Sequence, residues 1–340
     1  MDNGATMHLA VSLFPGIADA SSGADPGFTR LAQFAQKAEA AELDMVVLAD
    51  TAPASGDDAA NGQMPFEATT LLAALATVTS RIGLVAAAST IAHQPYNLAR
   101  RFASLDIISH GRAGWNATMT QAPREAANFS RPEGFSGDDF RRRTQEYIGI
   151  VQGLWQGWDA DALLFDQTGG RFHDPEKMHL LDHKGEFFSV RGPLNVARSP
   201  QDTPVLVLSD LSEPDLDAAA RTADVILLDD GPINGTKARY VDLKRRVVAC
   251  GRDPDAVRLL TNISLVTDGT ARRTLIDSME KGFQAKSCDG FNIRMPAQLS
   301  ALDDFVDLVL PELRRRGLFR ESYRGATLRS HLGLAGGGDQ

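Results

Sequence analysis

The chain has 340 residues, enough for two average domains or for one large α/β barrel. Its 35 basic and 44 acidic side chains give a formal net charge of −9, which argues against a nucleic-acid-binding protein. Two cysteines exclude a disulfide framework, and we see neither a signal peptide nor an apolar run of about 18 residues that could span a membrane. We therefore expect a cytoplasmic protein with no nucleic-acid partner and no membrane association.

Short apolar runs recur along the chain. In chain order they are 8–14, 45–50, 81–90, 112–119, 204–210, 224–230, 257–266 and 290–295. Their nearly continuous apolar character is typical of parallel strands that are covered on both faces. Amphipathic stretches separate them, and the clearest helical stripes run from Leu31 to Ala38, from Phe140 to Trp155 and from Leu302 to Leu313. Eight strands, each followed by a helix, predict a (β/α)8 TIM barrel, with residues 1–340 as a single domain.

A doubly wound sheet is the alternative fold. It would normally place a G-x-G-x-x-G turn after the first strand, and the turn here reads LFPGIADASSG. Residues 159–203 interrupt the alternation; they are rich in Gly, Pro and Asp and contain the hairpin-like string GEFFSVRG. We interpret them as an insertion between helix 4 and strand 5. The tail, about residues 335–340, is expected to be disordered.

A barrel of this kind places its active site at the C-terminal ends of its strands. Polar residues gather at these positions of the sequence. They are Asp50 after the second strand, Ser89 and Thr90 after the third, Asn116, Thr118 and Thr120 at the fourth, Ser209, Asp210 and Ser212 at the fifth, and Asp229 and Asp230 at the sixth. One polar residue at a strand end is ordinary, but their recurrence at five strands indicates a pocket.

Other motifs are absent or weak. His173, His179 and His183 lie in the insertion, but the spacing H-E-x-x-H does not occur, so we expect solvated loop histidines and no metal site. No G-x-S-x-G elbow and no P-loop occurs, which argues against an α/β-hydrolase and a P-loop NTPase. Arg141 falls in the first turn of helix 4, where it could lean over the barrel and meet an anion.

Several long strings of the sequence are distinctive. They are FEATTLLAALATVTSRIGLVAAAST, PYNLARRFASLDIISHGRAGWN, EAANFS, LWQGW, DPEKMHLLDHKGEFFSVRGPLNV and TLRSHLGL. They resemble the bacterial luciferase-like flavin-dependent monooxygenases, and most of all the nitrilotriacetate, dibenzothiophene-sulfone and pristinamycin monooxygenase branch. The resemblance implies a (β/α)8 barrel that uses reduced FMN, supplied by a separate flavin reductase, and O₂ to oxygenate a small organic substrate. It also implies a homodimer.

The resemblance assigns cofactor-binding positions residue by residue. Asp50 and Thr90 match positions beside the flavin ring, and Asn116 matches an asparagine that approaches the ring edge. Ser212 matches a serine of the strand-five turn that holds the phosphate. Further candidate cofactor contacts, from their places at strand ends and at the start of helix 4, are Thr118, Arg141, Ser209 and Asp210. No catalytic acid or base is assigned.

Other positions depart from the family pattern near the phosphate. Gly137 and Arg141 stand where the family has a histidine and a tyrosine, and the turn A-G-S-S-x-x-G reads S-D-L-S-E-P-D. Asp210 and Asp215 thus replace glycines, and Leu211 replaces a serine. A carboxylate about 4 Å from a phosphate charge costs roughly 4 kcal/mol at an effective dielectric constant of 20. Arg141 could offset this cost by pairing with Asp210 or by binding the phosphate.

Three functions therefore stay open on the sequence. The leading hypothesis is a two-component flavin-dependent monooxygenase. The altered phosphate turn favours a second, a non-catalytic homologue that acts as a binding protein or partner subunit. The third is a flavin-independent enzyme with an acid–base set drawn from Asp50, His8 and Asp229. In each case residues 51–65, which are rich in Gly, Ala and Asp, are predicted to form a mobile lid over the pocket.

Overall fold

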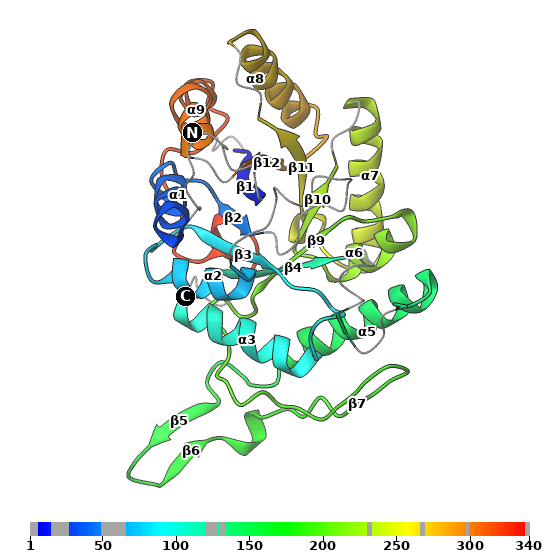
Figure 1. Cartoon of the computed structure of the whole chain (residues 1–340). Helices are drawn as coiled ribbons and strands as arrows, with labels where there is room; N and C mark the ends of the chain where they lie inside the picture. Colours follow the sequence, from blue (N-terminus) through cyan, green and yellow to red (C-terminus); the bar gives the residue numbers. More distant parts are fainter. Residues whose placement is uncertain are drawn as a thin grey trace.

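The computed structural model describes residues 6–14, 27–48, 66–119, 128–129, 133–229, 233–265, 269–296 and 299–336. Eight parallel strands form a closed barrel (Figure 1). In chain order they are β1 (His8–Phe14), β2 (Met45–Leu48), β3 (Gly83–Ala87), β4 (Ala113–Thr118), β9 (Val205–Ser209), β10 (Val225–Leu228), β11 (Arg258–Ser264) and β12 (Gly290–Pro296). Neighbours around the barrel follow the order β1, β12, β11, β10, β9, β4, β3 and β2. The eight predicted runs are these strands, and the predicted barrel is confirmed.

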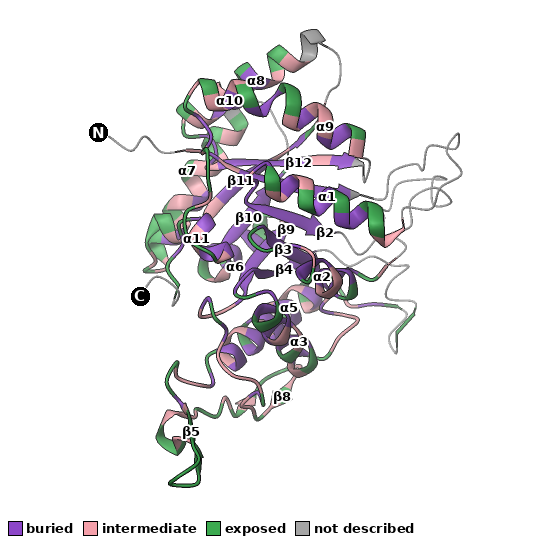
Figure 2. Cartoon of the chain, turned by 90° about the vertical axis from the view of Figure 1, so that its left-hand side faces the viewer, coloured by how far each residue is buried: buried purple, intermediate pink, exposed green. Residues whose placement is uncertain are grey.

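Helices follow the strands and cover the outside of the barrel. They are α1 (Phe28–Ala40), α2 (Ala68–Ala76), α3 (Pro95–Ile108), α5 (Gly137–Trp155), α6 (Leu216–Thr222), α7 (Ile233–Ala249), α8 (Gly269–Gln284), α9 (Leu299–Leu308) and α10 (Leu310–Arg315). Figure 2 shows buried residues on the strands and exposed residues on the outer helix surfaces. The predicted stripes face inward; Phe34 of α1, Val151 of α5 and Phe305 of α9 are all buried. No helix within the described ranges is long and apolar enough to cross a membrane.

The predicted insertion lies between α5 and β9 and forms two antiparallel hairpins. One pairs β5 (Leu163–Asp166) with β6 (Arg171–His173), and the other pairs β7 (His183–Lys184) with β8 (Ser189–Val190). The second is the predicted GEFFSVRG hairpin. The first extends away from the barrel (Figure 1) and was not predicted, because its mostly exposed residues show no apolar alternation.

At the N-terminal ends of the strands, the barrel interior is apolar and is closed by the C-terminal segment of the chain. Val205 and Val207 belong to an inner cluster that also contains Leu328, the first residue of helix α11 (Leu328–His331). A Cβ atom added to Gly83 would lie 2.3 Å from Cδ1 of Leu328. Gly83 therefore gives Leu328 the room to close the N-terminal end of the barrel, so the opposite end is left for a site.

Candidate functional site

Inside the barrel, the side chains change from apolar to polar toward the C-terminal ends of the strands, which we call the barrel mouth. Asn292 of β12 donates from Nδ2 to Oγ of Ser12 in β1 at 2.8 Å and to Oδ1 of Asn262 in β11 at 2.7 Å. Asn262 in turn donates from Nδ2 to Oδ1 of Asp229, just after β10, at 3.3 Å. This polar chain joins four neighbouring strands and directs its amide hydrogens to a carboxylate at the mouth. Sequence reasoning missed Ser12, Asn262 and Asn292.

Asp210 follows β9 beside the end of this polar chain. Its φ is +56°, in the left-handed region, which aspartate tolerates better than most residues with a Cβ atom. Ser209 donates from Oγ to Oδ2 of Asp210 at 3.3 Å. Burial raises the pKa of Asp210, the charge of Asp229 raises it further, and Ser209 and Arg294 oppose the shift. The mouth between β9 and β12 thus holds two carboxyl groups and one guanidinium, and Arg294 is a third contributor that sequence reasoning missed.

Asn116 of β4 faces the barrel interior. It pairs in register with Val207, a member of the inner cluster, whereas its neighbour Trp115 packs in the outer core. Trp115 lies 6.0 Å from Tyr147 and 6.3 Å from Trp155 between ring centres, so it packs against α5 on the outer face of the strand. Asn116 is 7% exposed, and its Oδ1 atom is buried without a hydrogen-bond partner among the described residues. An acceptor left in this state costs about 1–3 kcal/mol, so a ligand N–H group at this position would relieve the cost.

Thr90, just after β3, ties the strand end to α5. Its Oγ1 lies 3.3 Å from Oγ1 of Thr144, and its carbonyl accepts from Nη1 of Arg143 at 2.9 Å. The Arg143 guanidinium is buried and lies 4.8 Å from the ring centre of Phe188 and 5.0 Å from that of Phe135. Thr90 is therefore held rigidly at the mouth. A run of three arginines such as residues 141–143 is by itself typical of a solvated helix face, and for Arg143 that interpretation is wrong.

The turn after β9 holds an ion pair with α5. The Ser212 backbone N–H donates to Oδ2 of Asp215 at 3.0 Å, and the Ser212 hydroxyl donates to the same oxygen. Arg141 donates from Nε to Oδ1 of Asp215 at 3.1 Å and from Nη1 to Oδ1 of Asp138 at 2.8 Å. The idea that Arg141 pairs with Asp210 is therefore wrong. Arg141 pairs instead with Asp215, a buried carboxylate of the same turn.

Some predicted positions are not placed. Asp50, Thr120, Asp230, the proposed lid at 51–65 and residues 337–340 of the tail lie outside the described residues, and of Thr118 only the backbone in β4 is described. Two further departures from the family pattern are placed. A Cβ atom on Gly137, at the start of α5, would meet nothing within 4 Å, and the carbonyl of Leu211 accepts from Nη2 of Arg239 at 3.3 Å.

His8 lies at the N-terminal end of β1, away from the mouth. Its Nδ1 is 3.3 Å from Oδ1 of Asp44, and Arg320 donates from Nη1 to the same oxygen at 2.6 Å. Burial alone would raise the pKa of Asp44, but Arg320 and His8 outweigh burial and lower the pKa to about 2. His8 is therefore no partner for Asp229 in an acid–base set, because the length of β1 separates His8 from the strand ends.

The insertion histidines make structural contacts. His179 lies 3.0 Å from Oδ1 of Asp159, and His183 lies 2.9 Å from Oε1 of Glu146. Glu146 also accepts from the backbone N–H groups of Phe187 and Phe188, so it holds the β7–β8 turn against α5. Within the described part of the chain, no group of three or more His, Cys, Asp or Glu residues is arranged to hold a metal ion.

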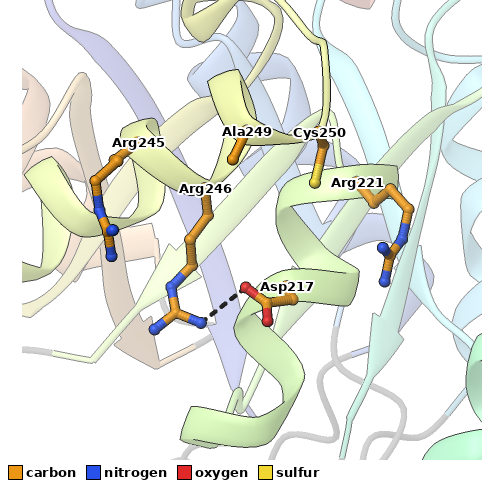
Figure 3. Close-up of a pocket in the computed structure, with 6 residues that line it drawn as sticks. All are labelled: Asp217, Arg221, Arg245, Arg246, Ala249 and Cys250. Carbon is orange, nitrogen blue, oxygen red and sulfur yellow. Dashed lines mark hydrogen bonds and ion pairs between the residues drawn. The ribbon is translucent and has the colours of Figure 1, made fainter.

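A surface hollow of about 510 Å³ lies on the outer helices (Figure 3). Its lining residues are Asp217 and Arg221 of α6, and Arg245, Arg246, Ala249 and Cys250 at and after the end of α7. Arg246 donates from Nη1 to Oδ1 of Asp217 at 2.8 Å and also pairs with Asp242, so its charge is already balanced. We interpret this hollow as a helix–helix contact, because its lining comes from the outer helices and not from the barrel strands.

A closed parallel barrel with a polar layer at its C-terminal mouth is the arrangement of (β/α)8 enzymes. The chain matches the family model of the luciferase-like monooxygenases over residues 7–276, and it belongs to that family. It is 33% identical to the N-acetyl-S-(2-succino)cysteine monooxygenase of Bacillus subtilis (strain 168), over 93% of this chain and 92% of that protein. It is also 33% identical to the nitrilotriacetate monooxygenase component A of Aminobacter aminovorans, over 89% of each chain.

The solved structures include a riboflavin lyase with modified FMN and riboflavin. It superposes with a TM-score of 0.87 at 25% identity and covers 97% of this chain and 96% of that chain. The family identified from the sequence is therefore confirmed, and so is the prediction of an enzyme of the monooxygenase class.

Proposed function

We propose that the protein is the oxygenase component of a two-component monooxygenase that uses reduced FMN and O₂ to oxygenate a small organic molecule. Membership of the luciferase-like family supports the oxygenation. The relative from Aminobacter aminovorans is named as component A, which supports a second component, and the riboflavin lyase structure holds a modified FMN, which supports a flavin. When bound, the flavin supplies the electrons that activate O₂, and the chain holds and orients the reactants.

The single observation on which the proposal rests is the unpartnered Oδ1 of Asn116. This acceptor is buried, faces the barrel interior and lies at the mouth, where a barrel enzyme binds its ligand. The edge of a reduced flavin ring presents N–H donors, which are the groups that a lone amide oxygen lacks. The ring end of the proposed site therefore fits a flavin. Asp50, Thr90, Thr118 and Ser209 are the further residues that we propose beside the ring.

The fit is different where the phosphate would lie. We propose Ser212, Arg141 and Asp210 as the residues nearest to it. The donors of Ser212 and Arg141 already go to Asp215, so they are not free for a phosphate while that contact lasts. The proposal therefore places the binding energy for the flavin at the ring end.

The test is an anaerobic titration of the full chain with reduced FMN. We expect saturable binding with a dissociation constant on the order of micromolar. The matched variant Asn116→Leu keeps the branched shape of the side chain and removes the acceptor, and it should weaken binding about tenfold, the loss of roughly one hydrogen bond. A folded wild-type protein that binds no reduced FMN would refute the proposal. If reduced FMN binds, the protein is then mixed with a flavin reductase, FMN, NADH and O₂, and oxygenation of candidate substrates is measured.

We further propose that the protein works in the cytoplasm as a homodimer with a separate flavin reductase. Cys250 and Cys288 are both free thiols, and Cys288 is buried, as fits a reducing compartment. Light scattering of the purified chain tests the dimer, because a mass of one chain at micromolar concentration would contradict it. Activity that needs no reductase would contradict the second component.

A further inference from the structure

The turn after β9 satisfies its own anion-binding donors. Asp215 is a buried carboxylate with 5% of its side chain exposed. Its Oδ2 accepts from the Ser212 backbone N–H at 3.0 Å and from the Ser212 hydroxyl, and its Oδ1 accepts from Nε of Arg141 at 3.1 Å. One backbone N–H group, one hydroxyl and one guanidinium thus surround a carboxylate that belongs to the chain itself. These are the kinds of donor that hold a phosphate in other proteins.

A simple cap does not explain the whole arrangement. A serine and an acidic residue three positions later commonly bond to each other at the start of a helix, and Ser212 and Asp215 do so. Arg141 adds a contact from α5, 74 residues away in the chain, and its second arm is held by Asp138 at 2.8 Å. The carboxylate is therefore held from two elements, and a phosphate could take these donors only by displacing Asp215.

Asp210 adds a second acidic group on the same turn. It lies with Asp229 nearby, and the pKa of Asp210 is raised by burial and by the charge of Asp229. A shift in this direction means that the surroundings of Asp210 already disfavour negative charge. Arg294 offsets part of the effect. A phosphate dianion brought to this turn would meet Asp210 and Asp215 together, with Arg141 already paired.

We propose that Asp215 takes the place of the cofactor phosphate, so that this protein binds flavin through its ring and accepts the dephosphorylated flavin, riboflavin, at least as well as FMN. This inference rests on the proposed function, because it presupposes that a flavin binds at the mouth. It assigns Asp215 as the residue that sets the class of flavin, with Ser212 and Arg141 as the groups that hold it.

The experiment compares reduced FMN with reduced riboflavin, each titrated anaerobically into the full wild-type chain. We expect the two dissociation constants to agree within about threefold, or riboflavin to bind more tightly. A preference for FMN of more than about threefold would overturn the inference and leave the proposed function intact. Binding of neither flavin would overturn both, so the two failures are distinguishable.

Variants assign the effect to one residue. Asp215→Asn keeps an acceptor for Ser212 and removes the negative charge, and it should improve the binding of FMN relative to riboflavin by at least about threefold. The double variant Asp210→Gly/Asp215→Gly should shift the ratio further in the same direction. Riboflavin binding at the wild-type affinity shows that a variant is folded.

The matched control is Asp217→Asn. Asp217 is an exposed carboxylate two residues further on, paired with Arg246 on the outer surface, so its charge should not change the ratio of the two dissociation constants. An unchanged ratio in Asp215→Asn, or an equal shift in Asp217→Asn, would overturn the assignment to Asp215.

Discussion

Ser12 and Asn292 are hydrogen-bonded to each other inside the barrel, with 2.8 Å between Oγ and Nδ2. Both are buried, and they come from neighbouring strands 280 residues apart in the chain. Asn292 also donates to Asn262, which donates to Asp229. The first and last strands of the barrel are thus joined by polar side chains that end at the mouth.

Loss of Asn292, at the centre of this polar chain, should destabilise the protein more than loss of Ser12 at its end. Asn292→Leu leaves Ser12 and Asn262 without their partner in a buried layer, and we expect it to lower the free energy of unfolding by about 2–3 kcal/mol. Ser12→Ala removes only the last member and should cost about 1 kcal/mol. Urea unfolding of both variants measures the difference. Equal costs would show that the chain does not act as a connected network.

The effects of the backbone conformation and of the charge of Asp210 can be tested with different substitutions. Its φ of +56° suits glycine and asparagine, so Asp210→Gly and Asp210→Asn should be at least as stable as the wild type. Asp210→Ala should lower the free energy of unfolding by about 1 kcal/mol relative to Asp210→Gly, because a Cβ atom is disfavoured in this conformation. Thermal unfolding of the three variants tests this order, and an alanine variant as stable as the glycine variant would contradict it.

The charge of Asp210 gives a pH dependence whose sign follows from its raised pKa. The folded protein holds the proton of Asp210 more tightly than the unfolded chain does. The protonated group therefore contributes to stability below pH 3.8, the ordinary pKa, and this contribution is lost as the pH rises through the higher folded pKa. Asp210→Asn should therefore be more stable than the wild type at pH 7, and the gain should shrink toward pH 4. A gain of the same size at both pH values would contradict the assignment.

Sequence reasoning succeeded where one strand or helix determines the answer. The eight apolar runs marked the barrel strands, and the amphipathic stripes marked the buried faces of α1, α5 and α9. It failed at pairings between elements. Arg141 and Asp215 meet only because α5 passes over the turn after β9, and no local pattern indicates that contact.

The missed polar chain has a different cause. Ser12, Asn262 and Asn292 are single polar residues inside apolar runs, and each looks like an exception within its own strand. Only the register, which pairs Asn262 with Asn292 across β11 and β12, shows that they form one layer. His8 was misjudged for the opposite reason: as the first residue of its strand it had to lie at the closed end of the barrel, and that position was readable from the sequence.

Asn116 should show a trade between stability and binding. Its Oδ1 is buried without a partner among the described residues, so the flavin-free protein bears the cost of an unsatisfied acceptor. Asn116→Leu should raise the free energy of unfolding of that protein by about 1 kcal/mol while it weakens flavin binding. Urea unfolding without flavin measures the first effect and anaerobic titration measures the second. A variant that is less stable than the wild type would show that the oxygen is satisfied in solution.

Asp44, at the closed end of the barrel, should make the free energy of unfolding depend on pH in the acid range. Asp44 is fully buried, accepts from the Leu9 backbone N–H at 2.6 Å and pairs with Arg320. Its folded pKa of about 2 lies below the ordinary value of 3.8. The charged group therefore contributes to stability above pH 3.8, and this contribution is lost as the pH falls through about 2. The size of the shift corresponds to about 2 kcal/mol. Asp44→Asn should therefore be less stable than the wild type by about that amount at pH 7, and the difference should shrink near pH 2.5.

Urea unfolding of both proteins at pH 7, 5 and 2.5 measures this change. Asp303→Asn is the matched control, because Asp303 also pairs with a cation, Lys37, but lies on the surface, where an ion pair contributes roughly 0–1 kcal/mol. If Asp44→Asn and the wild type differ by the same amount at pH 7 and pH 2.5, the contribution of Asp44 comes from its shape and hydrogen bonds and not from its charge. A difference that grows toward low pH would contradict the sign worked out above, because it would require a folded pKa higher than the unfolded one.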